Sequence, residues 1–200
     1  DPGSVDLQLR QLDTLQPALY RTVVRSGGDR LVSLPAAEQR RGILAGEAPL
    51  VWVYVATSDD GLHFSPITLW KFDDGADLGQ YNTQSHWVTH SDALYLVYTR
   101  RGANNDHVMR HRAPLFIAEV DAARLTVKRA TERILIPELG ASYGNFGVCD
   151  INEKETWVVE TESMRNPKGV IPVDNPWGSK GRVYAARILW NKPNKAWDQH

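Results

Sequence analysis

An internal repeat is the feature that most limits how this 200-residue chain can fold. The segment Arg30–Leu34 resembles Leu94–Tyr98, both resemble Thr156–Glu160, and a polar turn precedes each of the three. Further along, Ala48–Tyr54 recurs 65 residues later as Ala113–Ala118. Because a fixed period indicates one supersecondary unit used several times, we expect three tandem units of roughly 62 to 68 residues each.

Short runs of β-branched and aromatic residues, bounded by turn residues, predict antiparallel strands in each unit, which we call A to D in chain order. The expected strands lie near 18–25, 30–34, 49–57 and 63–70 in the first unit, near 85–90, 94–100, 113–120 and 125–136 in the second, and near 144–150, 156–162 and 182–190 in the third. The prediction is therefore an all-β chain, a single domain of three four-stranded sheets over about 15–73, 80–137 and 143–200.

Four-stranded sheets repeated in tandem are typical of β-propeller blades, and known propellers have about four blades or more. Three units are too few to close a ring. We therefore expect a partial propeller that lacks N-terminal blades, or a homodimer that completes a six-bladed ring. An open array of three sheets or a β-sandwich is the structural alternative.

Composition narrows the classes of partner. The chain has 23 basic and 24 acidic residues, a net charge of −1, so we expect neither nucleic acid nor a membrane surface as partner. No stretch approaches the ~20 apolar residues of a membrane span. The single cysteine, Cys149, stands between Phe146, Val148 and other strand residues, which predicts a buried, inert thiol and leaves the redox compartment open.

The turn Ser58–Phe64 combines Asp60, which can accept hydrogen bonds from turn amides, with Gly61, which can adopt a positive φ. It resembles the Asp-box, or BNR repeat, of sialidase-like propellers, although it is one residue short and ends in Phe64. We assign this box a structural role, as support for an outer hairpin, and no catalytic one.

A longer resemblance covers roughly the last 150 residues, and its motifs lie between Tyr81 and Glu162. The chain is similar there to bacterial proteins described as sialidase-like or exo-sialidase-like. The motifs that carry it are His86–His90, Tyr98–Arg101, Gly102–His107, Arg110–Leu115 and Gly144–Gly147. The resemblance implies a carbohydrate-active propeller. No cofactor is predicted, and the location stays open, with a periplasmic or extracellular one favoured.

In a propeller, the D–A and B–C connections emerge on one face, where ligands usually bind. Here the B–C loops are long, at 35–48, 102–111 and 163–181, and long loops are more often functional than filler. The arginine guanidinium can bind a carboxylate through two parallel hydrogen bonds. The resemblance implies three such arginines around an acidic sugar. The candidate substrate-binding residues are Arg21, Arg101, His107, Arg112 and Asn145.

Antiparallel pairing sets the start of strand A beside the end of strand B, which predicts His86 beside Tyr98 and Tyr143 beside Glu160. A tyrosine beside a glutamate matches the nucleophile arrangement that the resemblance implies. Asp106 is the loop carboxylate best situated for acid/base work. The candidate catalytic residues are thus His86, Asp106, Tyr143 and Glu160. Two histidine pairs, His86 with His90 and His107 with His111, lack a third ligand at fixed spacing, so no metal site is predicted.

The leading hypothesis is a sialidase-like glycoside hydrolase that acts on an acidic sugar. One alternative is a propeller that binds carbohydrate or protein without turnover, since fold alone does not separate the two. The other is a polysaccharide lyase, in which His86 and Tyr143 would abstract and return a proton.

Overall fold

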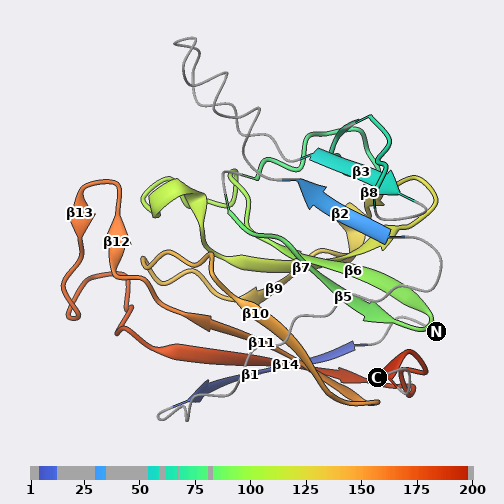
Figure 1. Cartoon of the computed structure of the whole chain (residues 1–200). Coiled ribbons are helices and arrows are strands. Elements are labelled where there is room, and N and C mark those ends of the chain that lie inside the picture. Colours follow the sequence, from blue (N-terminus) through green and yellow to red (C-terminus); the bar gives the residue numbers. More distant parts are fainter. Residues whose placement is uncertain are drawn as a thin grey trace.

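The computed structural model describes residues 5–12, 30–34, 54–58, 62–66, 68–80 and 83–197, and these form an all-β structure (Figure 1). The named strands pair antiparallel, and every sheet among the described residues is open. Two short 3₁₀ turns, Met109–His111 and Arg129–Thr131, interrupt the loops.

The middle sheet contains the four strands expected for the second unit. They are β5 (His86–His90), β6 (Ala93–Tyr98), β7 (Leu115–Asp121) and β8 (Thr126–Val127), hydrogen-bonded in chain order. A fifth strand, β9 (Arg133–Ile136), also pairs with β7. The stretch expected as one fourth strand therefore forms two short ones.

The first sheet has three described strands, which confirm three of the four expected. These are β2 (Arg30–Leu34), β3 (Tyr54–Ser58) and β4 (Thr68–Leu69), again paired in chain order. The strand expected near 18–25 lies outside the described residues, and so do Arg21 and the box residues Asp60 and Gly61.

The third sheet contains the three expected strands, β10 (Gly147–Asn152), β11 (Glu155–Thr161) and β14 (Val183–Trp190). Its fourth strand, β1 (Val5–Leu12), was not predicted: it pairs with β14 with Val5 opposite Trp190 and Leu12 opposite Val183. The alternating residues Val5, Leu7 and Leu9 are the signal that could have revealed it. A small hairpin, β12 (Arg165–Asn166) with β13 (Gly169–Val170), projects from the loop between β11 and β14 (Figure 1).

The three sheets are stacked face to face in chain order, with the second in the middle. Alternate residues of a strand point to opposite faces, and the middle sheet uses both. On β6, Leu96 and Tyr98 join Val55 and Trp70 in the core shared with the first sheet. Val97, between them, joins the core shared with the third sheet, together with Ala186, Ile188 and other β14 residues. Successive apolar residues are therefore buried over Leu96–Tyr98 of β6 and Leu115–Ala118 of β7.

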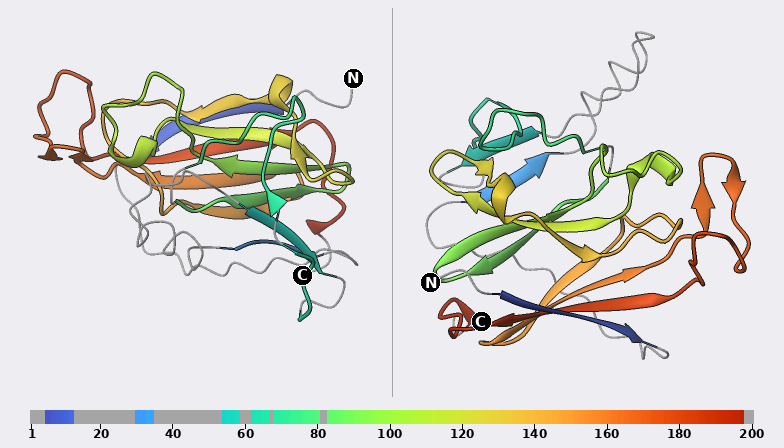
Figure 2. Two further views of the ribbon diagram at one scale, coloured as in Figure 1. Left: turned by 90° about the horizontal axis from the view of Figure 1, so that it is seen from above. Right: turned by 180° about the vertical axis from the view of Figure 1, so that it is seen from behind.

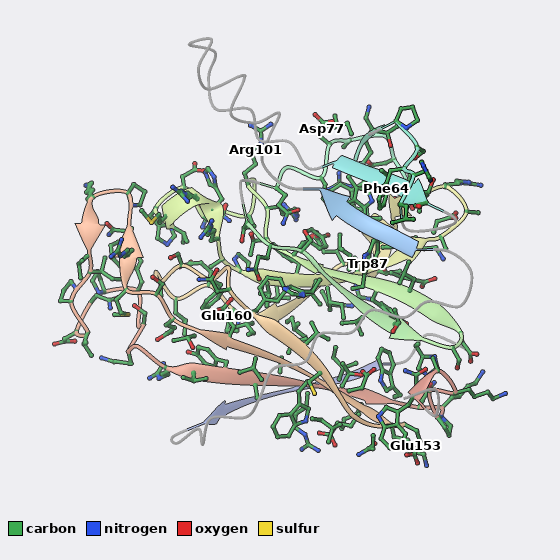
Figure 3. All side chains as sticks on the ribbon, viewed as in Figure 1. Phe64, Asp77, Trp87, Arg101, Glu153 and Glu160 are labelled. Carbon is green, nitrogen blue, oxygen red and sulfur yellow. The ribbon has the colours of Figure 1, made fainter. Side chains whose placement is uncertain are left out.

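One end of this stack gathers the long connections, and the other end carries short turns. The loop between β6 and β7, the segment between β9 and β10 and the loop between β11 and β14 emerge at the same end, where the β12–β13 hairpin projects (Figure 2). The turns after His90 and Asn152 lie at the opposite end, near the labelled Glu153 (Figure 3). This arrangement places the loops 102–111 and 163–181 together, as expected from strand direction; the loop 35–48 lies outside the described residues.

Two details of the sequence interpretation were wrong. Val97, rather than Tyr98, lies opposite His86, because the hairpin turn consists of Ser91 and Asp92 and starts β6 one residue early. Cys149 is exposed, because Phe146 and Val148 face the core and period-two alternation turns Cys149 to the other face of β10.

Candidate functional site

Three segments meet at the end with long connections. The backbone N–H of Tyr143 donates to the carbonyl of Arg112 at 2.6 Å, which joins the segment before β10 to the loop between β6 and β7. His107 of that loop contacts Glu138 at 3.0 Å and stacks on Trp177 of the loop between β11 and β14. Figure 3 shows Glu160, on β11, on this side of the molecule, and Arg101, in the loop after β6, above it.

Arg112 and Gly144 form the centre of the site. A Cβ at Gly144 would lie 3.0 Å from Cδ and 3.2 Å from Nη1 of Arg112, so the arginine side chain lies directly on this glycine. The φ of Gly144 is +144°, a conformation that residues with a side chain rarely adopt. Burial, and then the charge of Arg110, lower the pKa of the partly buried Arg112. The site therefore contains a partly buried cation.

Glu160 is the buried carboxylate beside this arginine. Its Oε2 accepts the N–H of Gly144 and its Oε1 the N–H of Thr161, each at 2.8 Å. Burial raises the pKa of Glu160, while these N–H donors and the charge of Arg112 act in the opposite direction. Glu160 thus fixes the glycine on which Arg112 rests.

Tyr143 directly precedes the Gly144 that Glu160 holds, but its hydroxyl is directed elsewhere. The hydroxyl donates to the carbonyl of Pro137 at 2.8 Å, and the side chain is buried. Burial, together with the charges of Glu162 and Glu160, raises the pKa of Tyr143 far above its ordinary value. In this geometry the phenol stays protonated and acts as a hydrogen-bond donor.

His86 and Asn145 border the same region. The His86 ring packs edge-on against Phe146, with centroids 4.8 Å apart, and its Nε2 lies 3.0 Å from Oε1 of Gln84. Burial lowers the pKa of His86, which favours the neutral imidazole at neutral pH. Asn145 is exposed, and its backbone N–H also reaches Glu160.

The remaining candidates on the loop between β6 and β7 are spread along it. Asp106 is 96% exposed at its side chain and contacts Nε2 of His111 at 3.2 Å. Arg101 is exposed and lies against the segment after β4, where its backbone N–H donates to the carbonyl of Gly79 at 3.0 Å. The structure therefore brings together Arg112, Tyr143, Asn145 and Glu160, with His86 adjoining them. Asp106 contacts His111, next to Arg112, from the solvent side, and Arg101 contacts Gly79 instead.

Asn105 holds this loop closed, a role that the sequence interpretation missed. Its side chain is fully buried, and Nδ2 donates to the carbonyls of Arg100 (2.8 Å), His111 (3.3 Å) and Ala113 (2.5 Å). These three carbonyls span both ends of the loop. An asparagine within a long loop is the only sequence signal for such a clamp.

Glu162 plays a matching role for the third loop. One of its carboxylate oxygens accepts the N–H groups of Lys180 (2.8 Å) and Arg182 (2.9 Å), and the other accepts the hydroxyl of Tyr184 at 3.0 Å. Both ends of the loop 163–181 are thereby tied to one buried side chain.

No group of three or more His, Cys, Asp or Glu side chains within the described ranges is placed to hold a metal ion. In the same part of the chain, no helix is long and apolar enough to cross a membrane. No protein-family model, curated protein or solved structure matches this chain.

Proposed function

We propose that this chain is a sialidase-like β-propeller protein that binds an acidic sugar at the end of the stack where Arg112 lies. The observation that carries the proposal is Arg112 itself: a partly buried guanidinium laid over Gly144, whose backbone is held by Glu160. Removal from water strengthens the attraction of such a cation for a carboxylate, and a planar guanidinium can bind both carboxylate oxygens.

The propeller part of the proposal is supported by the order of the sheets. Three sheets stack face to face in chain order, and within them β2 to β4, β5 to β8, and β10, β11 and β14 are paired in chain order. Pairing of β1 with β14 joins strands from the two ends of the chain, a connection that a ring of sheets needs. Further blades would come from a second copy of the chain or from additional sequence.

Binding is favoured over turnover by the state of the candidate catalytic groups. The Tyr143 hydroxyl is committed to Pro137, and both Glu160 oxygens accept backbone N–H groups. Asp106 faces solvent beside His111. Binding an acidic sugar requires Arg112 in this position, but it does not require Tyr143, Glu160 or Asp106 to be available for proton transfer.

Glycoside hydrolysis is the second candidate, because burial raises the pKa of Glu160, as a general acid requires. Incubation with 3′-sialyllactose, followed by chromatography, separates the two candidates. Intact trisaccharide after prolonged incubation supports binding alone, and release of lactose supports the hydrolase.

Replacing Arg112 with lysine tests the binding site. The variant keeps the positive charge but loses the paired hydrogen bonds to the carboxylate. We therefore expect the affinity for the methyl α-glycoside of N-acetylneuraminic acid to fall about tenfold, or about 1.4 kcal/mol. Isothermal titration calorimetry measures it. Arg110→Lys is the matched control, because Arg110 is exposed two residues away, and we expect it to bind as the wild type does.

The methyl ester of the same sugar provides the second control. It lacks the negative charge, so its affinity should be weak and the same for wild type and Arg112→Lys. An equal loss for the acid and the ester would contradict recognition of a carboxylate by Arg112.

A further inference from the structure

Trp177 is a large aromatic side chain exposed at the same end of the molecule, with 37% of its surface accessible. Its loop is held by its own hydrogen bonds. The backbone N–H of Trp177 donates to Oδ1 of Asn175 at 3.1 Å, and Nδ2 of Asn175 donates to the carbonyls of Pro172 (2.8 Å) and Ser179 (3.0 Å). The indole is therefore presented from a fixed backbone.

The indole ring is also fixed from the other side. It stacks on the imidazole of His107, with centroids 5.6 Å apart and planes inclined by 20°, and His107 is held by Glu138 at 3.0 Å. Gly140, with φ +90°, lies under the base of the side chain: a Cβ there would come within 2.5 Å of Cβ of Trp177. Groups from three separate segments thus hold one partly exposed aromatic ring.

The glycine that contacts this ring lies four residues before the glycine that contacts Arg112. Gly140 contacts Trp177 and Gly144 contacts Arg112, and the four residues from one glycine to the other span about 14 Å at most. A ligand of two or three sugar units is long enough to touch both. Sugar rings have an apolar C–H face, and a fixed aromatic ring offers flat contact area at little conformational cost.

We propose that Trp177 is the stacking platform for a neutral sugar unit of the same oligosaccharide whose acidic unit is held at Arg112. The inference rests on the proposed function and extends it: the ligand is an acidic oligosaccharide rather than a single acidic sugar. Val170 and Val173, exposed by 78% and 60% on the same loop, offer no flat face for stacking.

The test compares a one-unit and a three-unit probe by isothermal titration calorimetry. The probes are the methyl α-glycoside of N-acetylneuraminic acid and 3′-sialyllactose, titrated into wild type, Trp177→Ala, Trp177→Phe and the control Val173→Ala. In the wild type we expect the trisaccharide to bind about tenfold more tightly, the effect of one stacked ring. Trp177→Ala should remove that difference and leave the affinity for the monosaccharide unchanged.

Trp177→Phe should keep most of the difference, and Val173→Ala should keep all of it. Trp177→Leu controls for the loss of packing, because leucine fills the space over Gly140 but has no aromatic face. The affinities of Trp177→Leu for the two probes should match those of Trp177→Ala. Thermal melting of every variant verifies that it is folded.

The two proposals fail in different ways. Equal affinity of the wild type for the two probes overturns the platform and leaves the acidic-sugar site standing. An equal loss for both probes in Trp177→Ala and Trp177→Leu gives Trp177 a structural role and also overturns the platform. Absence of binding of either probe to the wild type overturns both proposals.

Discussion

Replacing Glu132 with glutamine is expected to lower the free energy of unfolding by about 3 kcal/mol, because it breaks a partly buried charge pair. One carboxylate oxygen of Glu132 accepts a hydrogen bond from Nη2 of Arg100 at 2.5 Å. The other accepts hydrogen bonds from Nε of Arg100 (2.8 Å) and from the hydroxyl of Tyr98 (2.5 Å). The two charged side chains are only 17% and 13% exposed. Arg100 also lies over the ring of Phe116, at 4.7 Å, so it would keep its burial and lose its counter-charge.

The same group predicts a pH dependence. Burial acts to raise the pKa of Glu132, but the hydrogen bonds from Arg100 and Tyr98 outweigh it, and the net pKa lies below its ordinary value. A carboxylate with a depressed folded-state pKa adds stability above its unfolded pKa, about 4.3, and loses it as the pH falls through the folded value. Wild type should therefore lose more stability than Glu132→Gln as the pH falls below about 4.3.

Urea unfolding at several pH values measures both effects. Glu153→Gln is the control, because Glu153 is exposed in a turn at the opposite end, and we expect it to change stability by less than about 0.5 kcal/mol. A Glu132→Gln protein as stable as wild type at pH 7 would contradict the structural role given to this pair.

Replacing Asn105 with alanine should lower the free energy of unfolding by roughly 2 to 3 kcal/mol, because buried carbonyl groups lose their donor. Three carbonyls at the two ends of the loop share the Nδ2 group of this fully buried side chain. Asn105→Asp keeps the shape but removes the donor and adds a charge among carbonyl oxygens, so its effect should be at least as large. Urea unfolding at pH 7 gives the values.

Asn104→Gly is the matched control for this pair of variants. Asn104 is the exposed neighbour with φ +54°, a conformation that glycine adopts easily, so its stability should stay within about 0.5 kcal/mol of wild type. Because Asn105 closes the loop that ends at Arg112, the folded fraction of Asn105→Ala should also bind the sugar glycoside less tightly. Wild-type stability in Asn105→Ala would show that the loop does not depend on this clamp.

Strand positions were the part most accessible to sequence reasoning, since period-two patterns and turn residues report directly on strands. Strands β5, β6 and β7 lie within two residues of their expected bounds. Strand β1 was missed because the search followed the repeat, and β1 completes the third sheet from a distant part of the chain. Long-range pairing of this kind leaves no local mark beyond the alternation of Val5, Leu7 and Leu9.

The sequence predicted which chain segments meet at the site, but it did not predict the hydrogen bonds that their side chains make. Strand direction correctly sets the segments of Arg112, Tyr143 and Glu160 at one end. It does not decide where a side chain finds its hydrogen bond, and the Tyr143 hydroxyl turned to Pro137. Asn105 and Trp177 lie in irregular loops, where periodicity carries no information about burial or contacts.

A crystal structure of the protein with the methyl α-glycoside of N-acetylneuraminic acid tests the central claim most directly. The account predicts the sugar at the end of the stack with the long loops, its carboxylate within hydrogen-bond distance of the Arg112 guanidinium and its ring beside Gly144 and Asn145. A sugar bound at the opposite end, near the turns at Ser91 or Glu153, would contradict it, as would a carboxylate that makes no contact with Arg112.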